Sequence, residues 1–171
     1  MQYYVIKPEV AGGWGEHIVV DRSVDPVQIK HLHYKFDGWL GDELLTTHPV
    51  YICTERVAAA LQAGKLSGFK LADVEVSRSS QFQEVYPDRT IPPFRWLQVT
   101  GAAERDDFGL RAGHLVVSER GLSCLRSFTL SHADVDTVAE FEWDPDKYTE
   151  QLFAEARARV EEMKRQKGLK K

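Results

Sequence analysis

The fold is decided by a stretch that occurs twice, as Val50-Tyr51-Ile52-Cys53-Thr54-Glu55-Arg56 and as Leu115-Val116-Val117-Ser118-Glu119-Arg120. The two stretches lie 64 positions apart, and the similarity continues beyond them. Aligned at that offset, the chain has identical residues at Glu55/Glu119, Arg56/Arg120, Leu61/Leu125, Leu66/Leu130 and Ser67/Ser131. Repeated patterns of this kind indicate a repeated structural unit.

Each copy has the features of a strand that runs into a helix. A short β-branched apolar run is typical of a buried strand. Thr54 or Ser118 then predicts an N-cap, whose hydroxyl accepts from a first-turn N–H. Glu55 or Glu119 follows, where the helix dipole favours negative charge. We therefore predict two strand–cap–helix–strand units, over about 50–77 and 114–139, and favour an internal duplication; the alternative is that capping chemistry recurs by chance.

The composition is that of an ordinary globular protein. The 171 residues are 43% hydrophobic and 28% charged, which fits one domain over 1–171. No apolar run approaches the roughly 20 residues that span a bilayer, and Met1-Gln2-Tyr3-Tyr4 does not resemble the start of a signal peptide. Only Cys53 and Cys124 are present, which favours buried thiols in a reducing compartment. We predict a cytoplasmic protein with no membrane partner.

The charge is distributed unevenly. Residues 1–150 carry 15 Lys and Arg against 23 Asp and Glu, whereas residues 151–171 carry 7 against 3. An acidic body makes nucleic acid an unlikely partner and is compatible with a basic protein partner. Nothing in the sequence indicates the oligomeric state.

Other segments predict the remaining elements. Strands are expected at 3–7, 17–20, 27–36 and 94–99, a turn with a short helix over 36–45, and a loop over 101–113. Asp144-Pro145-Asp146 predicts the start of a long helix over 145–166, with an apolar stripe of Tyr148, Leu152, Ala156, Val160 and Met163. We predict a single α+β domain, with two similar strand–helix units on a mixed or antiparallel sheet and a long C-terminal helix.

The sequence shows no convincing catalytic set. His31-x-His33 is the only spacing typical of metal ligands, and a third ligand would have to be distant, such as His17 or His48. Cys53 and Cys124 lie among apolar residues, which favours unreactive thiols. We predict no metal, no cofactor and no catalytic residue.

Two acidic stretches are candidates for a partner-binding surface. Both are expected to be exposed, and Trp39 is expected at the centre of the first as an aromatic anchor. Their residues are Asp37, Trp39, Asp42 and Glu43, and Glu104, Asp106 and Asp107. The motif residues Thr54, Glu55, Arg56, Ser118, Glu119 and Arg120 are interpreted as structural, with a twofold acidic–basic site as the alternative.

The repeated motif also carries a resemblance. The run from Leu115 through Arg120 to Phe128, continuing at Leu130–Val135, resembles the C-terminal half of small bacterial immunity proteins of the myxobacterial type, and Val50–Arg56 is similar to the same motif. These proteins accompany polymorphic toxins. The resemblance implies a noncatalytic, cytoplasmic α+β protein that binds and neutralises a cognate toxin. It supplies no catalytic residues, and Gly121 departs from a good helix start.

A second class of function stays open. The chain is alternatively a small enzyme or ligand-binding domain, whose site would be assembled from scattered His, Asp and Glu residues. A deep cleft lined by such residues would favour this alternative, and a shallow acidic face would favour toxin binding.

Overall fold

The computed structural model describes residues 1–141, Trp143, and the single positions Ala154, Arg157, Ala158, Glu161 and Arg165. Met1–Glu140 form one compact unit and Phe141–Lys171 a second, whereas one domain over 1–171 was predicted. Apart from those single positions, the predicted helix over 145–166 lies outside the described residues, as does its apolar stripe.

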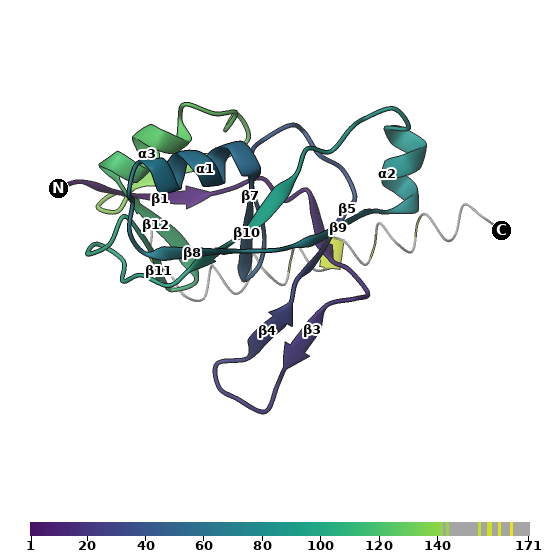
Figure 1. Cartoon of the computed structure of the whole chain (residues 1–171), viewed down its shortest axis with the longest axis horizontal. Helices are drawn as coiled ribbons and strands as arrows, with labels where there is room; N and C mark the ends of the chain where they lie inside the picture. The colour runs from purple at the N-terminus through teal and green to yellow at the C-terminus, as the bar shows by residue number, and fades with distance from the viewer. Residues whose placement is uncertain (142, 144–153, 155–156, 159–160, 162–164, 166–171) are drawn as a thin grey trace. The chain divides into compact units, whose positions relative to one another are not determined.

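The first unit is an α+β fold made mostly of strands (Figure 1). One antiparallel sheet has the order β11 (Phe108–Arg111), β12 (His114–Ser118), β1 (Tyr3–Lys7), β13 (Asp134–Thr137). A second antiparallel sheet has the order β6 (Leu44–Thr47), β7 (Val50–Thr54), β10 (Phe94–Val99), β8 (Phe69–Ala72). Two smaller sheets are β2 (Gly12–Trp14), β5 (His33–Phe36), β9 (Glu75–Arg78), and the hairpin β3 (Val19–Asp21), β4 (Gln28–His31). The helices are α1 (Glu55–Ala63), α2 (Ser80–Val85) and α3 (Glu119–Leu125).

The predicted repeat is present in the structure. The elements β6-β7-α1-β8 and β11-β12-α3-β13 follow each other in the same order, and corresponding strands begin 64 or 65 positions apart. Each unit belongs to its own antiparallel sheet, so the expectation of one shared sheet is wrong. A duplication as the origin of the repeat stays a prediction.

The two units exchange a strand. β1, which lies before the first unit in the chain, pairs with β12 and β13 of the second, while β10 pairs with β7 and β8 of the first. The registers correspond: Val5 faces Asp136, and Trp96 faces Ala72, which lies 64 positions before Asp136. Main-chain bonds correspond as well, since Glu119 N donates to Gln2 O and Glu55 N donates to Pro93 O. Each half therefore depends on the other for a central strand.

The two predicted N-caps are confirmed. Thr54 Oγ1 accepts from Val57 N, and Ser118 Oγ accepts from Gly121 N. Both cap residues have extended backbone angles, as a residue that precedes a helix requires.

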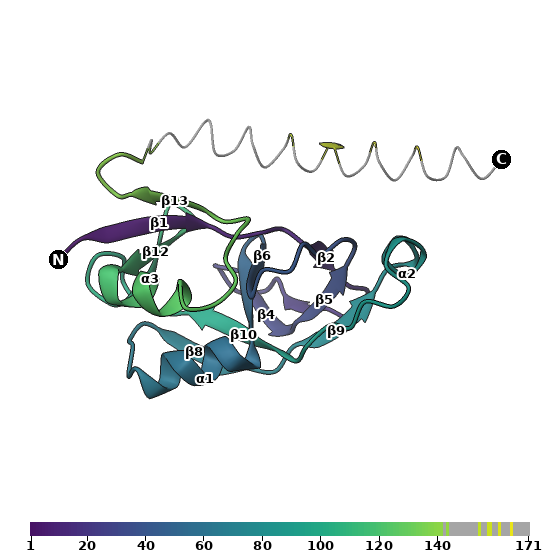
Figure 2. The same ribbon diagram turned by 90° about the horizontal axis from the view of Figure 1, so that it is seen from above.

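Two apolar cores hold the compact unit Met1–Glu140 together. The first lies between the repeated units, where α1 and α3 run side by side (Figures 1 and 2). It contains residues such as Ile6, Tyr51, Leu97 and Leu115. The second is aromatic and joins β5 and α2 to β7, through residues that include Tyr34, Phe36, Phe82 and Phe94. Alternate residues of β7 enter different cores, Tyr51 the first and Ile52 the second, which is why the strand is apolar from Val50 to Cys53.

Several predicted element boundaries differ from the structure. The segment 36–45 contains no helix, and Leu44 begins a strand. The predicted loop 101–113 contains β11, and α2 was not predicted. The predicted strand over 27–36 is two strands, β4 and β5, which belong to different sheets. The strands at 3–7 and 94–99 are confirmed.

Candidate functional site

The first acidic stretch is largely buried, so its expected exposure is wrong. Asp42 is 0% exposed, Glu43 8% and Trp39 9%. Trp39 Nε1 donates to Asp42 O, 2.9 Å away. Only Asp37 is exposed. In the second stretch Glu104 is exposed, Asp106 is half-buried and Asp107 is buried. Neither stretch presents the continuous acidic surface that the sequence predicted.

Glu43 is the centre of a hydrogen-bonded group that we call the first carboxylate centre, with Thr54, Arg56 and Thr129. Thr54 Oγ1 donates to Glu43 Oε1 at 3.1 Å, while Arg56 donates to both carboxylate oxygens at 2.9 Å. Thr129 N, in the loop after α3, donates to Oε2 at 2.9 Å. The cap and the arginine come from the first unit, and the main-chain donor comes from the second.

Asp107 forms the second carboxylate centre with Ser118, Arg120 and Ser67, and it lies 64 positions after Glu43. Ser118 Oγ donates to Asp107 Oδ1 at 2.6 Å, and Arg120 Nη2 donates to Oδ2 at 3.0 Å. Ser67 N, in the loop after α1, donates to Oδ2 at 2.9 Å. The second centre thus has the same three kinds of donor as the first: a cap hydroxyl, an arginine and a main-chain N–H of the opposite unit. Thr54, Arg56, Ser118 and Arg120 therefore hold the two carboxylates in place, and a purely structural role for them stays a prediction.

These contacts set the charge of both carboxylates. Burial by itself would raise the pKa of Glu43, but bonds from Arg56, Thr129 N and Thr54 outweigh it and lower that pKa. The same balance, with Arg120, Ser118 and Ser67 N, lowers the pKa of Asp107. Both carboxylates are thus ionised near neutral pH. Glu55 and Glu119 are exposed, as first-turn residues of their helices.

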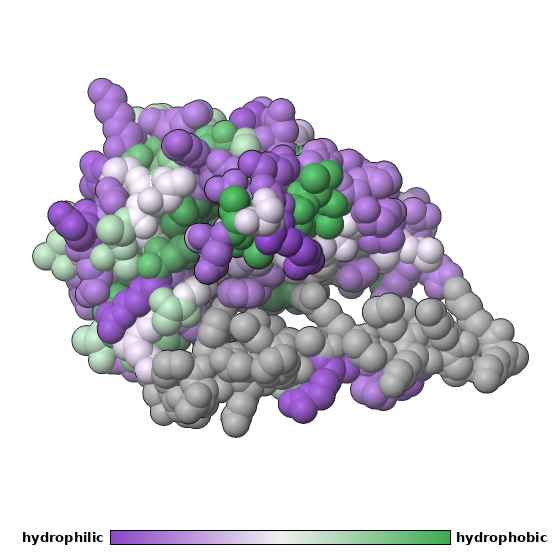
Figure 3. All heavy atoms as spheres, turned by 90° about the horizontal axis from the view of Figure 1, so that it is seen from below, coloured by the Kyte–Doolittle hydropathy of each residue, from purple (hydrophilic) through white to green (hydrophobic). Residues whose placement is uncertain are grey.

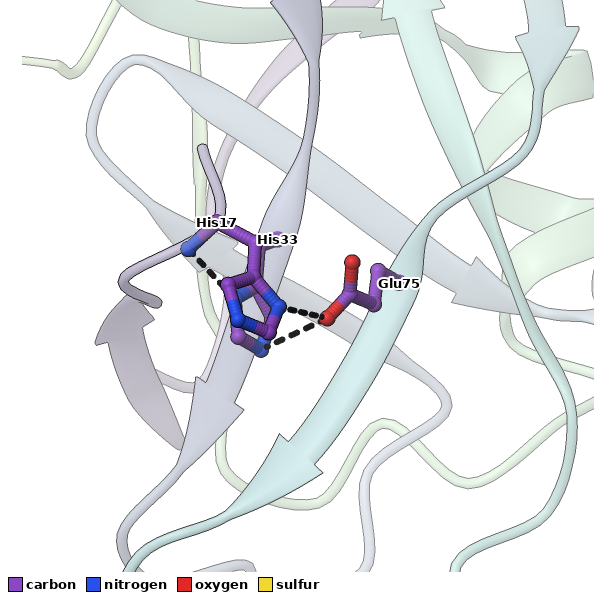
Figure 4. Close-up of side chains that lie close together, drawn as sticks. All are labelled: His17, His33 and Glu75. Carbon is purple, nitrogen blue, oxygen red and sulfur yellow. Dashed lines mark hydrogen bonds and ion pairs between the residues drawn. The ribbon is translucent and has the colours of Figure 1, made fainter. Parts of the chain in front are cut away.

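A histidine cluster of His17, His31, His33 and Glu75 lies at the base of the hairpin (Figure 4 shows three of its members). His17 Nδ1 lies 2.6 Å from Glu75 Oε2, and His31 Nε2 lies 2.9 Å from Oε1. The rings of His17 and His33 stack, with their centroids 4.9 Å apart. The pKa of Glu75 falls to about 2 because His17 and His31 bind its carboxylate, and Glu75 in turn raises the pKa of His17.

The tautomer of His33 argues against a metal ion in this cluster. The nearest ligand atoms of His17, His33 and Glu75 lie within 4.8 Å of one another. However, His17 N donates to His33 Nδ1 at 3.0 Å, so the ring proton is on Nε2, where it meets Ser77 Oγ at 2.7 Å. Neutral histidine that binds a metal through Nε2 needs its proton on Nδ1. The cluster is best described as a hydrogen-bonded tie between the hairpin and β9.

A second cluster, the Glu9 cluster, contains Glu9, Asp42 and His132. His132 Nδ1 lies 3.1 Å from Asp42 Oδ1 and 3.8 Å from Glu9 Oε1. Main-chain N–H groups of Ser131 and His132 also donate to Asp42. Burial and the neighbouring Asp42 carboxylate raise the pKa of Glu9, partly offset by donation from Leu40 N.

The hairpin β3–β4 projects from the body (Figure 1). It carries exposed apolar side chains. Of the large apolar side chains that are exposed in the described residues, four fall within 14–27: Trp14, Val19, Val24 and Val27. Figure 3 looks onto the face from which the hairpin projects, and apolar atoms lie near its centre. β3 and β4 pair only with each other among the described strands.

Other features add little chemistry. Cys53 is buried, and burial raises its pKa to about 12; the pKa of Cys124 is also raised by burial. Both thiols are therefore weak nucleophiles. A cavity of about 270 Å³ adjoins the first carboxylate centre and is lined by residues that include Trp39, Arg56, Pro92 and Pro93. None of the helices in the described part of the chain is long and apolar enough to cross a membrane.

No family model, no curated protein and no solved structure matches the chain. The fold and the site therefore rest on the residues themselves.

Sequence reasoning missed three members of the two clusters. Glu75, Glu9 and His132 attracted no attention, because each belongs to a segment that is unremarkable by itself. His17 was named only as a distant partner for His31 and His33. One signal was available: Glu43 and Asp107 lie at the same 64-residue offset as the motif, which marked them as members of the repeat rather than of a surface.

Proposed function

We propose that this chain is a noncatalytic binding protein of the immunity type, which neutralises a cognate basic toxin domain by docking through the hairpin β3–β4. The observation that carries the proposal is the group of exposed apolar side chains on a projecting hairpin, at Val19, Val24 and Val27, with Trp14 beside its base. Apolar side chains that are exposed together mark protein interaction sites, and tryptophan is among the commonest anchors of an interface. A projecting hairpin is suited to a concave surface such as an enzyme cleft.

The base of the hairpin supports this role. His17 and His31 lie at its two ends, and both bind Glu75 of β9. The hairpin is therefore held to the body at both ends. A docking element that is already ordered loses less conformational entropy on binding.

The overall charge supports a basic partner. Residues 1–140 carry 14 Lys and Arg against 19 Asp and Glu. Opposite net charges on two proteins raise the rate at which they associate, and salt reduces this effect. The acidic balance thus favours encounter, while the apolar hairpin provides the contact that persists.

The proposal predicts a toxin domain encoded beside this gene, and the test is binding to that domain and protection against it. The wild-type protein should bind it and protect cells that express it, with an association rate that falls as salt rises. A Val24→Asp, Val27→Asp double variant should bind at least about tenfold more weakly, because one lost anchor is worth more than about 1.4 kcal/mol. The matched control is Val85→Asp, which changes another exposed valine, at the end of α2.

Two outcomes would contradict the proposal. No binding by the wild-type protein, and no protection, would reject the immunity function. Full binding by the hairpin double variant would reject the docking surface while leaving the function in place.

A ligand-binding or catalytic domain is the second candidate. The convergence of His17, His31 and His33 on Glu75 favours it, since these residues are scattered in sequence and meet in space. The cluster lies at the surface, with the His17 side chain 64% exposed. A toxin-independent activity that is lost in Glu75→Gln would favour this candidate over the first.

A further inference from the structure

We propose that Glu9, Asp42 and His132 form a binding site for a divalent transition-metal ion, with Zn²⁺ as the best-matched ion. The three residues come from distant segments: Glu9 follows β1, Asp42 precedes β6, and His132 lies between α3 and β13. One ligand atom from each lies within 4.8 Å of the others.

The distances suit a tetrahedral ion. Bonds of about 2.0–2.1 Å from zinc to nitrogen or oxygen place neighbouring ligand atoms about 3.3 Å apart. His132 Nδ1 lies 3.1 Å from Asp42 Oδ1 and 3.8 Å from Glu9 Oε1. Shifts of a few tenths of an ångström therefore bring each carboxylate oxygen to the spacing from His132 Nδ1 that two ligands of one ion require. Three protein ligands would leave one position of the tetrahedron open.

The donor pattern distinguishes His132 from His33. Both atoms that face His132 Nδ1 are carboxylate oxygens, and no N–H donor in the described part of the chain points at it. A metal ion can replace the proton on Nδ1 while Nε2 keeps its own proton. His33 Nδ1, by contrast, already accepts from His17 N. The groups that face the two Nδ1 atoms therefore favour a metal ion in the Glu9 cluster over one in the histidine cluster.

The two buried carboxylates of the cluster also favour a bound cation. The side chains of Glu9 and Asp42 are 5% and 0% exposed, and the only basic side chain that pairs with either among the described residues is the half-exposed His132. Two buried carboxylates side by side repel each other unless a proton or a metal ion lies between them.

The carboxylates are already oriented for such a role. Leu40 N donates to Glu9 Oε2, whereas Ser131 N and His132 N donate to Asp42. Hydrogen bonds of this kind hold metal-binding carboxylates in place. A bound ion would join the N-terminal strand, the start of the first unit and the loop after α3.

The experiment titrates the untagged, chelator-treated full chain with zinc chloride near neutral pH by calorimetry, together with thermal unfolding. One Zn²⁺ per chain should bind and raise the melting temperature. His132→Ala and Glu9→Gln should each weaken binding at least about tenfold, since even residues that only support a ligand contribute 10- to 100-fold. The matched control, His31→Ala, changes a histidine of the other cluster and should keep the affinity. Magnesium chloride should not substitute.

Folding is checked in the same variants. Glu9→Gln keeps the size of the side chain and removes the carboxylate, and thermal unfolding of the metal-free variant shows whether it is folded. Weak zinc binding by this folded variant then reports a lost ligand.

Three outcomes would overturn the proposal: no saturable zinc binding, unchanged affinity in both His132→Ala and Glu9→Gln, or binding lost in His17→Ala and kept in His132→Ala. The last would assign the ion to the histidine cluster. Because zinc alone is the probe, these results are independent of toxin binding.

Discussion

The two carboxylate centres have the same kinds of hydrogen-bond donors but differ in the geometry of the hydrogen bonds. In both, a buried carboxylate accepts from its own helix cap, its own arginine and a main-chain N–H of the opposite unit. Glu43 binds Arg56 through two parallel bonds, whereas Asp107 has one bond to Arg120 and a shorter bond to its cap hydroxyl, 2.6 Å against 3.1 Å. The longer side chain thus favours the arginine and the shorter one favours the cap. The carboxylates join the two halves, as the exchanged strands do.

The largest expected effect comes from removal of either carboxylate. Glu43→Ala or Asp107→Ala should reduce the free energy of unfolding by about 2–4 kcal/mol, because several buried donors lose their acceptor. Urea unfolding of the purified variants measures this. Glu55→Ala and Glu119→Ala are the controls, with exposed carboxylates and losses below about 1 kcal/mol. Equal losses at buried and exposed positions would reject the joining role.

The second largest effect should come from acid, which should reduce the stabilisation that both carboxylate centres provide. The folded pKa values of Glu43 and Asp107 are lowered, so their stabilisation is present above the ordinary values of 4.5 and 3.8 and is lost as pH falls below them. The unfolding free energy of the wild type should thus fall more steeply between about pH 5 and pH 3 than that of a Glu43→Gln, Asp107→Asn double variant. Glu75, whose pKa is also lowered, is present in both proteins and contributes equally to the two pH profiles. Parallel pH profiles would show that the two carboxylates are not stabilised in the fold.

The two N-caps should contribute different amounts to the free energy of unfolding. Ser118→Ala should destabilise by about 2 kcal/mol and Thr54→Ala by about 1 kcal/mol, at the two ends of the usual range for caps. Ser118 Oγ makes the shorter bonds to both its partners, at 2.6 Å and 3.0 Å, against 3.1 Å and 3.4 Å for Thr54. Denaturant titration of the two variants decides the order, and a larger loss for Thr54→Ala would contradict it.

Local patterns in the sequence predicted the repeat, because a strand, a cap and a first helical turn lie within a few residues. The run Val50–Arg56 contains all three signals, and the structure confirms them. The exchange of β1 and β10 could not be predicted, since their partner strands lie from 24 to more than 100 residues away in the chain and such pairing leaves no local pattern. The strand Leu44–Thr47 was taken for part of a short helix because it is brief and buried, without polar alternation.

The candidate sites were predicted less well, for a related reason. An acidic residue beside a tryptophan looks the same in sequence whether it is exposed or buried. Asp42 is buried because two main-chain N–H groups, from Ser131 and His132, replace its hydration. Those donors come from a loop about ninety residues later. Only the fold brings them together, as it does Glu75 with the histidines.

The smallest effect concerns Gly121, the counterpart of Val57 in the other helix. Glycine within a helix is about 1 kcal/mol less favourable than alanine. An added Cβ would lie 3.3 Å from Asp107 O, a tight contact, and 3.5 Å from Ser118 Oγ. The helix preference exceeds the small shift that this contact requires, so Gly121→Ala should stabilise by about 0.5 kcal/mol. Denaturant unfolding measures the change, and Ala58→Gly in α1 is the reverse control. A loss of stability in Gly121→Ala would show that the second centre is packed too tightly for the side chain that the first one accepts.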